Sequence, residues 1–185
     1  MLEVKMSTIM KKERLGLPPE YKKQPEYFDA FNLNDETDQK NSAIENLLRE
    51  HGVKTILDMT YGTGSQVFFL GKRGYQVTGS DFSPDLLKIA RKKASDQQLN
   101  VPFIYGNMPT LKAGHFDAAI TIFNAVGHLK KAGFEKAMRN IARNLNPGGI
   151  YLFDILNLEA MTEDVVSNLA IYLQKKVGDK TVQPR

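Results

Sequence analysis

The stretch Thr55–Gly64 places the strongest constraint on the fold of this chain. An apolar run with β-branched residues ends in the acid Asp58, and a glycine turn follows. A second apolar run, Tyr75–Gly79, ends in a serine and Asp81. The distance from the glycine turn to Asp81 suits a loop, a helix and a returning parallel strand. This spacing predicts a site for a ribose-bearing cofactor at the carboxyl ends of parallel strands.

Composition limits the class of protein. The chain has 185 residues, of which 42% are hydrophobic and 25% charged, as expected for one globular domain with a sizeable core. No apolar run approaches the length that spans a bilayer, and Met1–Lys12 lacks the apolar block of a signal peptide. The chain has no cysteine, which excludes disulfides, thiolate zinc sites and a cysteine nucleophile. We expect a cytoplasmic protein without a metal site or a membrane partner.

The chain is basic, with a formal net charge of +4 and a pI of about 9.1. Positive residues cluster within Lys11–Lys23 and again within Lys88–Lys93. A basic surface can bind nucleic acid, but no aromatic residues interleave with the second cluster as a stacking platform requires. The pattern favours a solvated helix face and a polar tail, so nucleic acid is not the expected partner.

Strand and helix patterns alternate along the chain as far as residue 154. The predicted strands cover residues 54–58, 76–80, 101–105, 116–123 and 150–154. The predicted helices run from residue 37 or 38 to 50, from the glycine turn to about 74, from 83 to about 94, and from 134 to 145. The turn Asn146–Gly149 is predicted to close the last helix. This alternation predicts a doubly wound α/β domain with a mostly parallel sheet.

The glycine turn does not fit a dinucleotide fingerprint. That fingerprint has three glycines in the pattern G-x-G-x-x-G, and the third allows close helix–strand packing under a pyrophosphate. The frame that begins at Gly62 has Val67 in the third position. A nicotinamide-dependent oxidoreductase is therefore an alternative that shares the acid after the second strand and fails at the third glycine.

Four segments, taken together and in order, resemble the class I S-adenosylmethionine-dependent methyltransferases between about residues 40 and 157. Asp58–Gly64 resembles their acid-x-G-x-G-x-G motif, and Gly106–Met108 resembles a G-D-M segment beside the adenine. Phe116–Ile120 resembles their fourth strand, and Leu145–Asp154 resembles the L-x-P-G-G segment that leads into their fifth. Phe123–Leu129 further resembles the F-N-x-x-G-H-L run of small-molecule enzymes, including relatives of glycine-type N-methyltransferases.

The resemblance implies a Rossmann-like sheet in the order 3-2-1-4-5 and S-adenosyl-L-methionine as the cofactor. It implies that Asp81 accepts hydrogen bonds from the ribose, that Phe82 lies against the adenine, and that Asn107 bonds the adenine amino group. The N-terminal segment that contains Tyr27 closes over the site in many relatives. The full set of implied cofactor-binding residues is Asp58, Thr60, Tyr61, Gly62, Gly64, Asp81, Phe82, Asn107, Met108, Phe123 and Tyr27.

Three residues depart from the family pattern. Thr60 replaces the first glycine of the motif, Tyr61 replaces a small residue, and Asn107 replaces an acid. A β-branched residue at Thr60 is strained if the position requires a positive φ. These departures keep open a catalytically inactive binding subunit with the methyltransferase fold.

The segment after the fourth predicted strand is where substrate meets cofactor in this family. Methyl transfer is an in-line displacement, and a base is needed only when the nucleophile must lose a proton. His128 is the candidate base because of its position and its titration range, and Asn124 is the candidate to orient substrate or cofactor. The absence of cysteine excludes pyrimidine-C5 methylation. We predict transfer to the nitrogen or oxygen of a small-molecule acceptor.

The resemblance also implies a domain division: residues 1–36 as an N-terminal lid, 37–157 as the core, and 158–185 as the start of a substrate-covering insertion. Residues 159–168 are predicted to be helical, and a hairpin is predicted around Gly178. The family's last two strands have no counterpart before residue 185, which suggests a truncated form of a longer protein. The exposed edge of the fifth strand then makes a homodimer an expectation.

Overall fold

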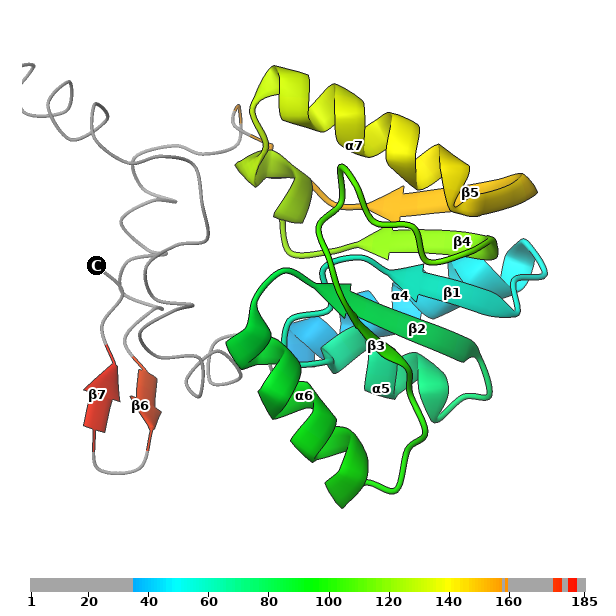
Figure 1. Ribbon diagram of the computed structural model, residues 1–185. Coiled ribbons are helices and arrows are strands. Elements are labelled where there is room, and N and C mark those ends of the chain that lie inside the picture. Colours follow the sequence, from blue (N-terminus) through cyan, green and yellow to red (C-terminus); the bar gives the residue numbers. More distant parts are fainter. Residues whose placement is uncertain (1–34, 158, 160–174, 178–179, 183–185) are drawn as a thin grey trace, which may run out of the picture.

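The computed structural model describes residues 35–157, 159, 175–177 and 180–182, and its central feature is a five-stranded sheet (Figure 1). The strand order is β3-β2-β1-β4-β5, and every neighbouring pair is parallel. The predicted α/β fold and its strand order are therefore confirmed. The strands are β1 (Thr55–Asp58), β2 (Gln76–Asp81), β3 (Phe103–Tyr105), β4 (Phe116–Thr121) and β5 (Leu145–Phe153).

Four α-helices and a short 3₁₀ helix accompany the sheet in the described residues. They are α4 (Asp35–Glu50), α5 (Ser65–Gly71), α6 (Pro84–Asp96), η2 (Ala125–His128) and α7 (Lys131–Arg143). The start of α6 follows from its sequence, since the Ser83 hydroxyl accepts a hydrogen bond from the backbone N–H of Leu86 at 3.4 Å and Pro84 occupies the first turn. Helix α4 ends as predicted, with Gly52 at φ +66°.

The sequence-based boundary of β5 is wrong. The segment Asn146–Gly149, predicted as a closing turn, lies inside β5, which begins at Leu145. Phe116 pairs with Leu145, and the register shifts before Ala118 pairs with Ile150. This irregularity keeps the glycine-rich segment beside β4, which is a tertiary effect that local turn chemistry does not reveal.

The core lies on both faces of the sheet because β1 is central and its side chains alternate. Ile56 belongs to a buried cluster with Leu48 of α4 and Leu87 of α6. Its neighbour Leu57 belongs to a second cluster with Ile141 of α7. Helices thus cover both faces, and the carboxyl ends of the strands point toward one common edge (Figure 1).

The C-terminal part of the described chain contains a pair of short strands. Strand β6 (Lys175–Val177) pairs antiparallel with β7 (Lys180–Val182), which confirms the predicted hairpin. The predicted lid over residues 1–36, apart from the start of α4, and nearly all of the helix predicted for 159–168 lie outside the described residues. Within the part of the chain that is described, no helix is long and apolar enough to cross a membrane, and β5 has β4 as its one partner strand.

Candidate functional site

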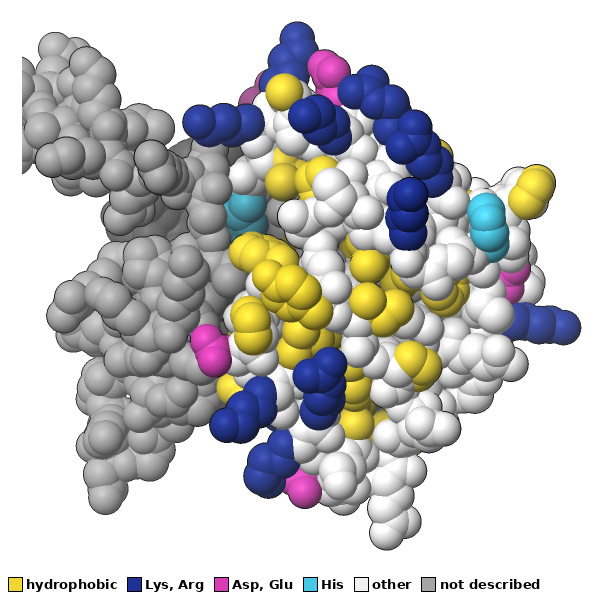
Figure 2. Space-filling model, in the orientation of Figure 1, with side chains coloured by type: hydrophobic (Ala, Val, Ile, Leu, Met, Phe, Trp, Pro, Cys, Tyr) yellow, Lys and Arg dark blue, Asp and Glu magenta, His cyan; other side chains and the backbone are white. Residues whose placement is uncertain are grey.

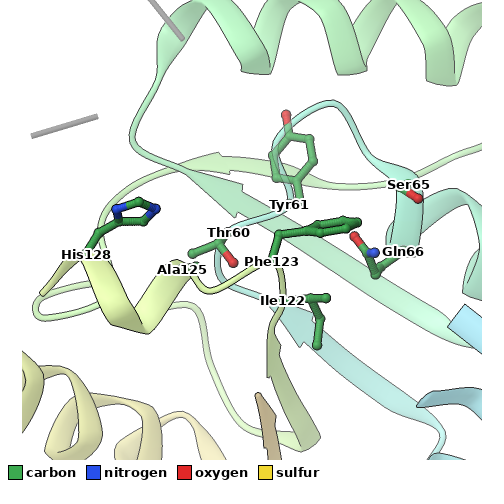
Figure 3. Close-up of a pocket in the computed structure, with 8 residues that line it drawn as sticks. All are labelled: Thr60, Tyr61, Ser65, Gln66, Ile122, Phe123, Ala125 and His128. Atoms are coloured by element: carbon green, nitrogen blue, oxygen red, sulfur yellow. The ribbon is translucent and has the colours of Figure 1, made fainter. Parts of the chain in front are cut away.

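A pocket opens at the carboxyl ends of β1 and β4, where the order of the strands reverses (Figure 3). Ligands of open α/β sheets bind at such a switch point. The walls come from two segments, the turn after β1 with the start of α5, and the segment after β4. The enclosed space is about 440 Å³ including its open mouth. The lining residues are Thr60, Tyr61, Ser65, Gln66, Ile122, Phe123, Ala125 and His128.

Asp81, at the end of β2, holds the glycine turn in place. Its side chain is only 5% exposed, and its two oxygens accept hydrogen bonds from the backbone N–H of Gly62 at 3.0 Å and of Ser83 at 2.8 Å. Burial raises the pKa of this carboxyl, and the backbone hydrogen bonds oppose the rise. The backbone N–H of Phe82 also bonds this carboxylate, and because a carboxylate offers about four lone-pair positions, capacity for a ligand hydroxyl remains.

Asp58, at the end of β1, is the most deeply buried acid of the site. It is 1% exposed, and its Oδ1 accepts a hydrogen bond from the backbone N–H of Thr60 at 3.0 Å. Burial raises the pKa of Asp58 to about 8. The nearby charge of Asp81 contributes to this rise, and the hydrogen bond from the Thr60 N–H opposes it. Asp58 therefore holds a proton at neutral pH, and a cationic group brought near it would favour its ionised form.

The motif's departure at Thr60 is accommodated without backbone strain. The described non-glycine residues with positive φ are Gln98, Phe123 and Asn124, so Thr60 does not adopt the left-handed conformation. The left-handed positions of the turn fall instead on Gly62 and Gly64, at φ 57° and 97°. The Thr60 hydroxyl is buried at the pocket and, within the described structure, has no hydrogen-bond partner. A buried group of this kind is suited to a ligand.

The bulk of Tyr61 is taken up by packing against the sheet. The side chain is 2% exposed, and its ring lies 5.0 Å from the ring of Phe103 in β3. A Cβ on Gly79 of β2 would come within 3.0 Å of the Tyr61 ring, so glycine at that position makes the space. Figure 3 shows the ring pointing away from Ile122 and Ala125. The two departures in the motif thus leave the pocket open.

The residues implied for the adenine lie next to this site at the ends of β2 and β3. Phe82 is 42% exposed, which leaves its ring available for contact. Asn107 is exposed, and its Oδ1 accepts a hydrogen bond from the Thr110 hydroxyl at 2.6 Å. Met108 is 8% exposed and belongs to the core cluster that includes Ile141 of α7.

On the face drawn in Figure 2, hydrophobic side chains gather near the middle with lysines and arginines around them.

The catalytic candidates lie after β4, in two different environments. His128, at the end of η2, is exposed and lines the pocket. Asn124 does not line it, and its Oδ1 accepts a hydrogen bond from the backbone N–H of Leu156 at 3.2 Å. Phe123 does line the pocket (Figure 3). Tyr27 lies outside the described residues.

Sequence reasoning missed the support that α4 gives to this site. Asn41 is 2% exposed, and it donates to the Ser65 hydroxyl at 3.3 Å while accepting from the Gln66 amide at 3.0 Å. Asn41 stands three residues before the core residue Ile44, on the same face of the helix. That helical spacing was the signal that could have placed it against α5.

Comparison with known proteins assigns the family. A family model described as a methyltransferase domain matches residues 56–149, which is half of the chain. The chain belongs to the class I S-adenosylmethionine-dependent methyltransferase domain family. The match covers both buried carboxylates and the whole of the segment after β4, so the pocket described above lies within the family's shared domain.

Three similar proteins illustrate the relationship. The demethylmenaquinone methyltransferase of Thermus thermophilus is 41% identical over 107 residues, which are 56% of this chain and 47% of that protein. The glycine/sarcosine N-methyltransferase of Parasynechococcus marenigrum is 27% identical over 168 residues, covering 82% of this chain and 60% of that protein. The crystal structure of the PH0226 protein from Pyrococcus horikoshii is 25% identical, with a TM-score of 0.69 over 86% of this chain and 71% of that one. The chain thus spans about half the length of the curated relatives that it matches.

Proposed function

We propose that this chain carries the cofactor site of an enzyme that transfers a methyl group from S-adenosyl-L-methionine to the nitrogen or oxygen of a small molecule. One observation supports the proposal most strongly. Two buried carboxyl groups, those of Asp58 and Asp81, end neighbouring strands beside Thr60, which lines the pocket and whose buried hydroxyl has no hydrogen-bond partner in the described residues. This donor and acceptor set fits a ligand that carries a ribose diol and an ammonium group.

The proposed cofactor contacts follow from where the side chains lie. Asp81 would accept the ribose hydroxyls, and Phe82 would cover the adenine with Asn107 and Met108 nearby. The turn at Gly62 and Gly64 lets the ligand approach the backbone closely. The remaining members of the proposed cofactor set are Asp58, Thr60, Tyr61, Phe123 and Tyr27.

The chain's own residues align the partners and handle the proton. When bound, the cofactor supplies an electrophilic methyl group. Phe123 and Ala125 line the acceptor side of the pocket and help to exclude water. His128 lines the same pocket and would take the proton from an acceptor N–H or O–H. Asn124 would act by fixing the turn beside Phe123, since its side-chain oxygen is bonded to the backbone of Leu156.

The small-molecule class of acceptor is supported by the relatives named glycine/sarcosine and glycine N-methyltransferase. A homodimer through the outer edge of β5 is a further proposal. Sedimentation at several protein concentrations tests it, and a concentration-independent monomer would contradict it.

Calorimetric titration with S-adenosylhomocysteine tests the cofactor site. We expect micromolar affinity in the wild type and a loss of about tenfold or more in Asp81→Asn, equivalent to about 1.4 kcal/mol. Asp85→Ala is the matched control, because Asp85 is an exposed acid at the start of the neighbouring helix. NAD should produce no binding heat, and heat from NAD alone would favour the oxidoreductase alternative.

Transfer itself is tested with a methyl-labelled cofactor and a panel of small amines and hydroxyl compounds. We expect label to appear in at least one acceptor and His128→Ala to slow its transfer. Cofactor binding without transfer to any acceptor would favour the inactive binding subunit. A folded protein that binds no S-adenosylhomocysteine would refute the proposed function.

A further inference from the structure

The pocket wall after β4 contains an unusual stretch of backbone. Phe123 and Asn124, two consecutive residues with side chains, adopt left-handed conformations at φ 63° and 56°. Such conformations are unfavourable for residues other than glycine and persist only when surrounding contacts impose them. Because Phe123 lines the pocket, whatever imposes this turn also shapes the pocket.

This turn contacts a carboxylate that directly follows β5. Asp154 Oδ1 accepts a hydrogen bond from the backbone N–H of Asn124 at 2.6 Å. A hydrogen bond to an ionised acceptor is shorter and stronger than one between neutral groups. The side chain of Asn124 closes the turn from the other side, through its bond to Leu156 and its tight contact with Gly127, where a Cβ would collide with the Asn124 oxygen.

A lysine from α4 completes the arrangement. Lys40 Nζ lies 2.8 Å from Asp154 Oδ2, and the same nitrogen lies 4.8 Å from the centroid of the Phe123 ring. The ammonium therefore joins the carboxylate that holds the backbone to the aromatic ring that lines the pocket. Three segments far apart in the sequence, α4 and the ends of β4 and β5, meet at this one cation.

We propose that Lys40 and Asp154 are positioning residues that fix the Phe123–Asn124 turn and thereby set the acceptor side of the pocket. Neither residue is among those that line the pocket. The part of this inference that concerns the acceptor rests on the proposed methyl transfer. Helix α4 then braces both walls of the site, the segment after β4 through Lys40 and the start of α5 through Asn41.

An ordinary surface ion pair contributes little to the stability of a protein. The test therefore needs a second ion pair of similar geometry as a control. Lys92 and Asp96 of α6 also lie 2.8 Å apart, and their side chains are 77% and 59% exposed against 40% and 32% for Lys40 and Asp154. Neither Lys92 nor Asp96 lines the pocket. Lys92→Met is therefore the control for Lys40→Met, and Lys40→Arg keeps the charge.

Nuclear magnetic resonance tests the turn without any acceptor. In the wild type, the Asn124 amide proton should resonate far downfield because it donates to a carboxylate over a short distance. Asp154→Asn should move it upfield, and Lys40→Met should move both this signal and the ring signals of Phe123. Lys92→Met should leave them in place. Unchanged Asn124 and Phe123 signals in both variants would overturn the proposal.

Kinetics tests the consequence for the acceptor. In Lys40→Met and Asp154→Asn, we expect kcat/KM for the acceptor to fall by about tenfold or more, because a displaced wall misaligns the reaction. The affinity for S-adenosylhomocysteine should fall clearly less than kcat/KM does, because Phe123 is only one of the proposed cofactor contacts, and Lys40→Arg should retain most of the wild-type kcat/KM. An equal fall in cofactor affinity would show a merely structural role and overturn the proposal. Absence of turnover in the wild type would refute the proposed function, while the resonance experiment would still decide whether the pair holds the turn.

Discussion

Asp58 makes the stability of this protein depend on pH in a direction opposite to that of most acids. Its pKa rises from 3.8 to about 8 because burial disfavours the charged form. The contribution of the protonated Asp58 side chain to the free energy of unfolding is fully present at pH values below 3.8, which is the pKa of this carboxyl in the unfolded chain. It is lost as the pH rises toward the pKa of the folded state, since the unfolded chain ionises first.

The size of the effect follows from the two pKa values. Over the interval between 3.8 and about 8, one proton separates the folded from the unfolded state, and each pH unit costs about 1.4 kcal/mol. Between about pH 5.5 and about pH 7.5, the free energy of unfolding should therefore fall by about 2.5 kcal/mol through Asp58 alone. Asp58→Asn removes this dependence and retains an oxygen to accept the Thr60 N–H.

Urea unfolding followed by circular dichroism at several pH values measures the effect, because the chain has no tryptophan to report by fluorescence. The quantity of interest is the free energy of unfolding of the wild type minus that of Asp58→Asn, in which other titrating groups cancel. Asp117→Asn is the control. The hydrogen bonds of Asp117 to Thr55, Asn146 and Lys54 lower its pKa to about 2, so its contribution is constant over this interval and is lost only in acid. Parallel wild-type and Asp58→Asn curves would refute the reasoning, because Asp58 would then be ionised throughout.

Three further predictions concern packing and hydrogen bonding, each measured as a change in the free energy of unfolding. Gly79→Ala should cost about 1–3 kcal/mol because the new methyl group collides with the Tyr61 ring, and adding Tyr61→Cys should remove most of that cost. If the effects of the two substitutions are additive, the two side chains are not in contact. Asn140→Leu should cost about 2 kcal/mol or more, because the buried amide of Asn140 donates to two backbone carbonyls of the segment before β4, at 2.9 and 2.7 Å. An unchanged stability would show that water takes over these two hydrogen bonds. Ser83→Ala should cost about 1 kcal/mol by removing the cap of α6, whereas Ser95→Ala, inside the same helix, should cost little; equal effects would show that the cap contributes nothing.

The sheet could be predicted from the sequence because its strands are apolar runs that end in polar residues at the site. Phe116–Thr121 is buried on both faces through its second half, and a continuous apolar run is the expected sign of such a strand. The strand order came from the family resemblance, since periodicity alone does not order parallel strands. The start of β5 was mispredicted because Asn146–Gly149 has the composition of a turn and is held in the strand by β4.

The contacts that adapt the site to its unusual residues were beyond sequence reasoning because they join distant positions. Tyr61 fits because Gly79 faces it on the neighbouring strand, and nothing local in either segment indicates the pairing. Lys40 and Asp154 are 114 residues apart in the sequence and meet only in the folded chain. The positive φ of Phe123 has no local signal either, since phenylalanine is a poor choice for that conformation.

These distant contacts change how the departures from the family motif are interpreted. A large residue and a β-branched residue in a cofactor turn suggest a closed, inactive site when the motif is considered alone. In the folded chain, Tyr61 packs against Gly79 of β2 and Phe103 of β3, and Thr60 lines the pocket with an unstrained backbone and a buried hydroxyl that has no partner in the described residues. The substitutions therefore do not argue for inactivity. Because Thr60 has a hydroxyl where the family motif has a glycine, Thr60→Gly should weaken S-adenosylhomocysteine binding if that hydroxyl bonds the ligand, and unchanged affinity in the calorimeter would show that it does not.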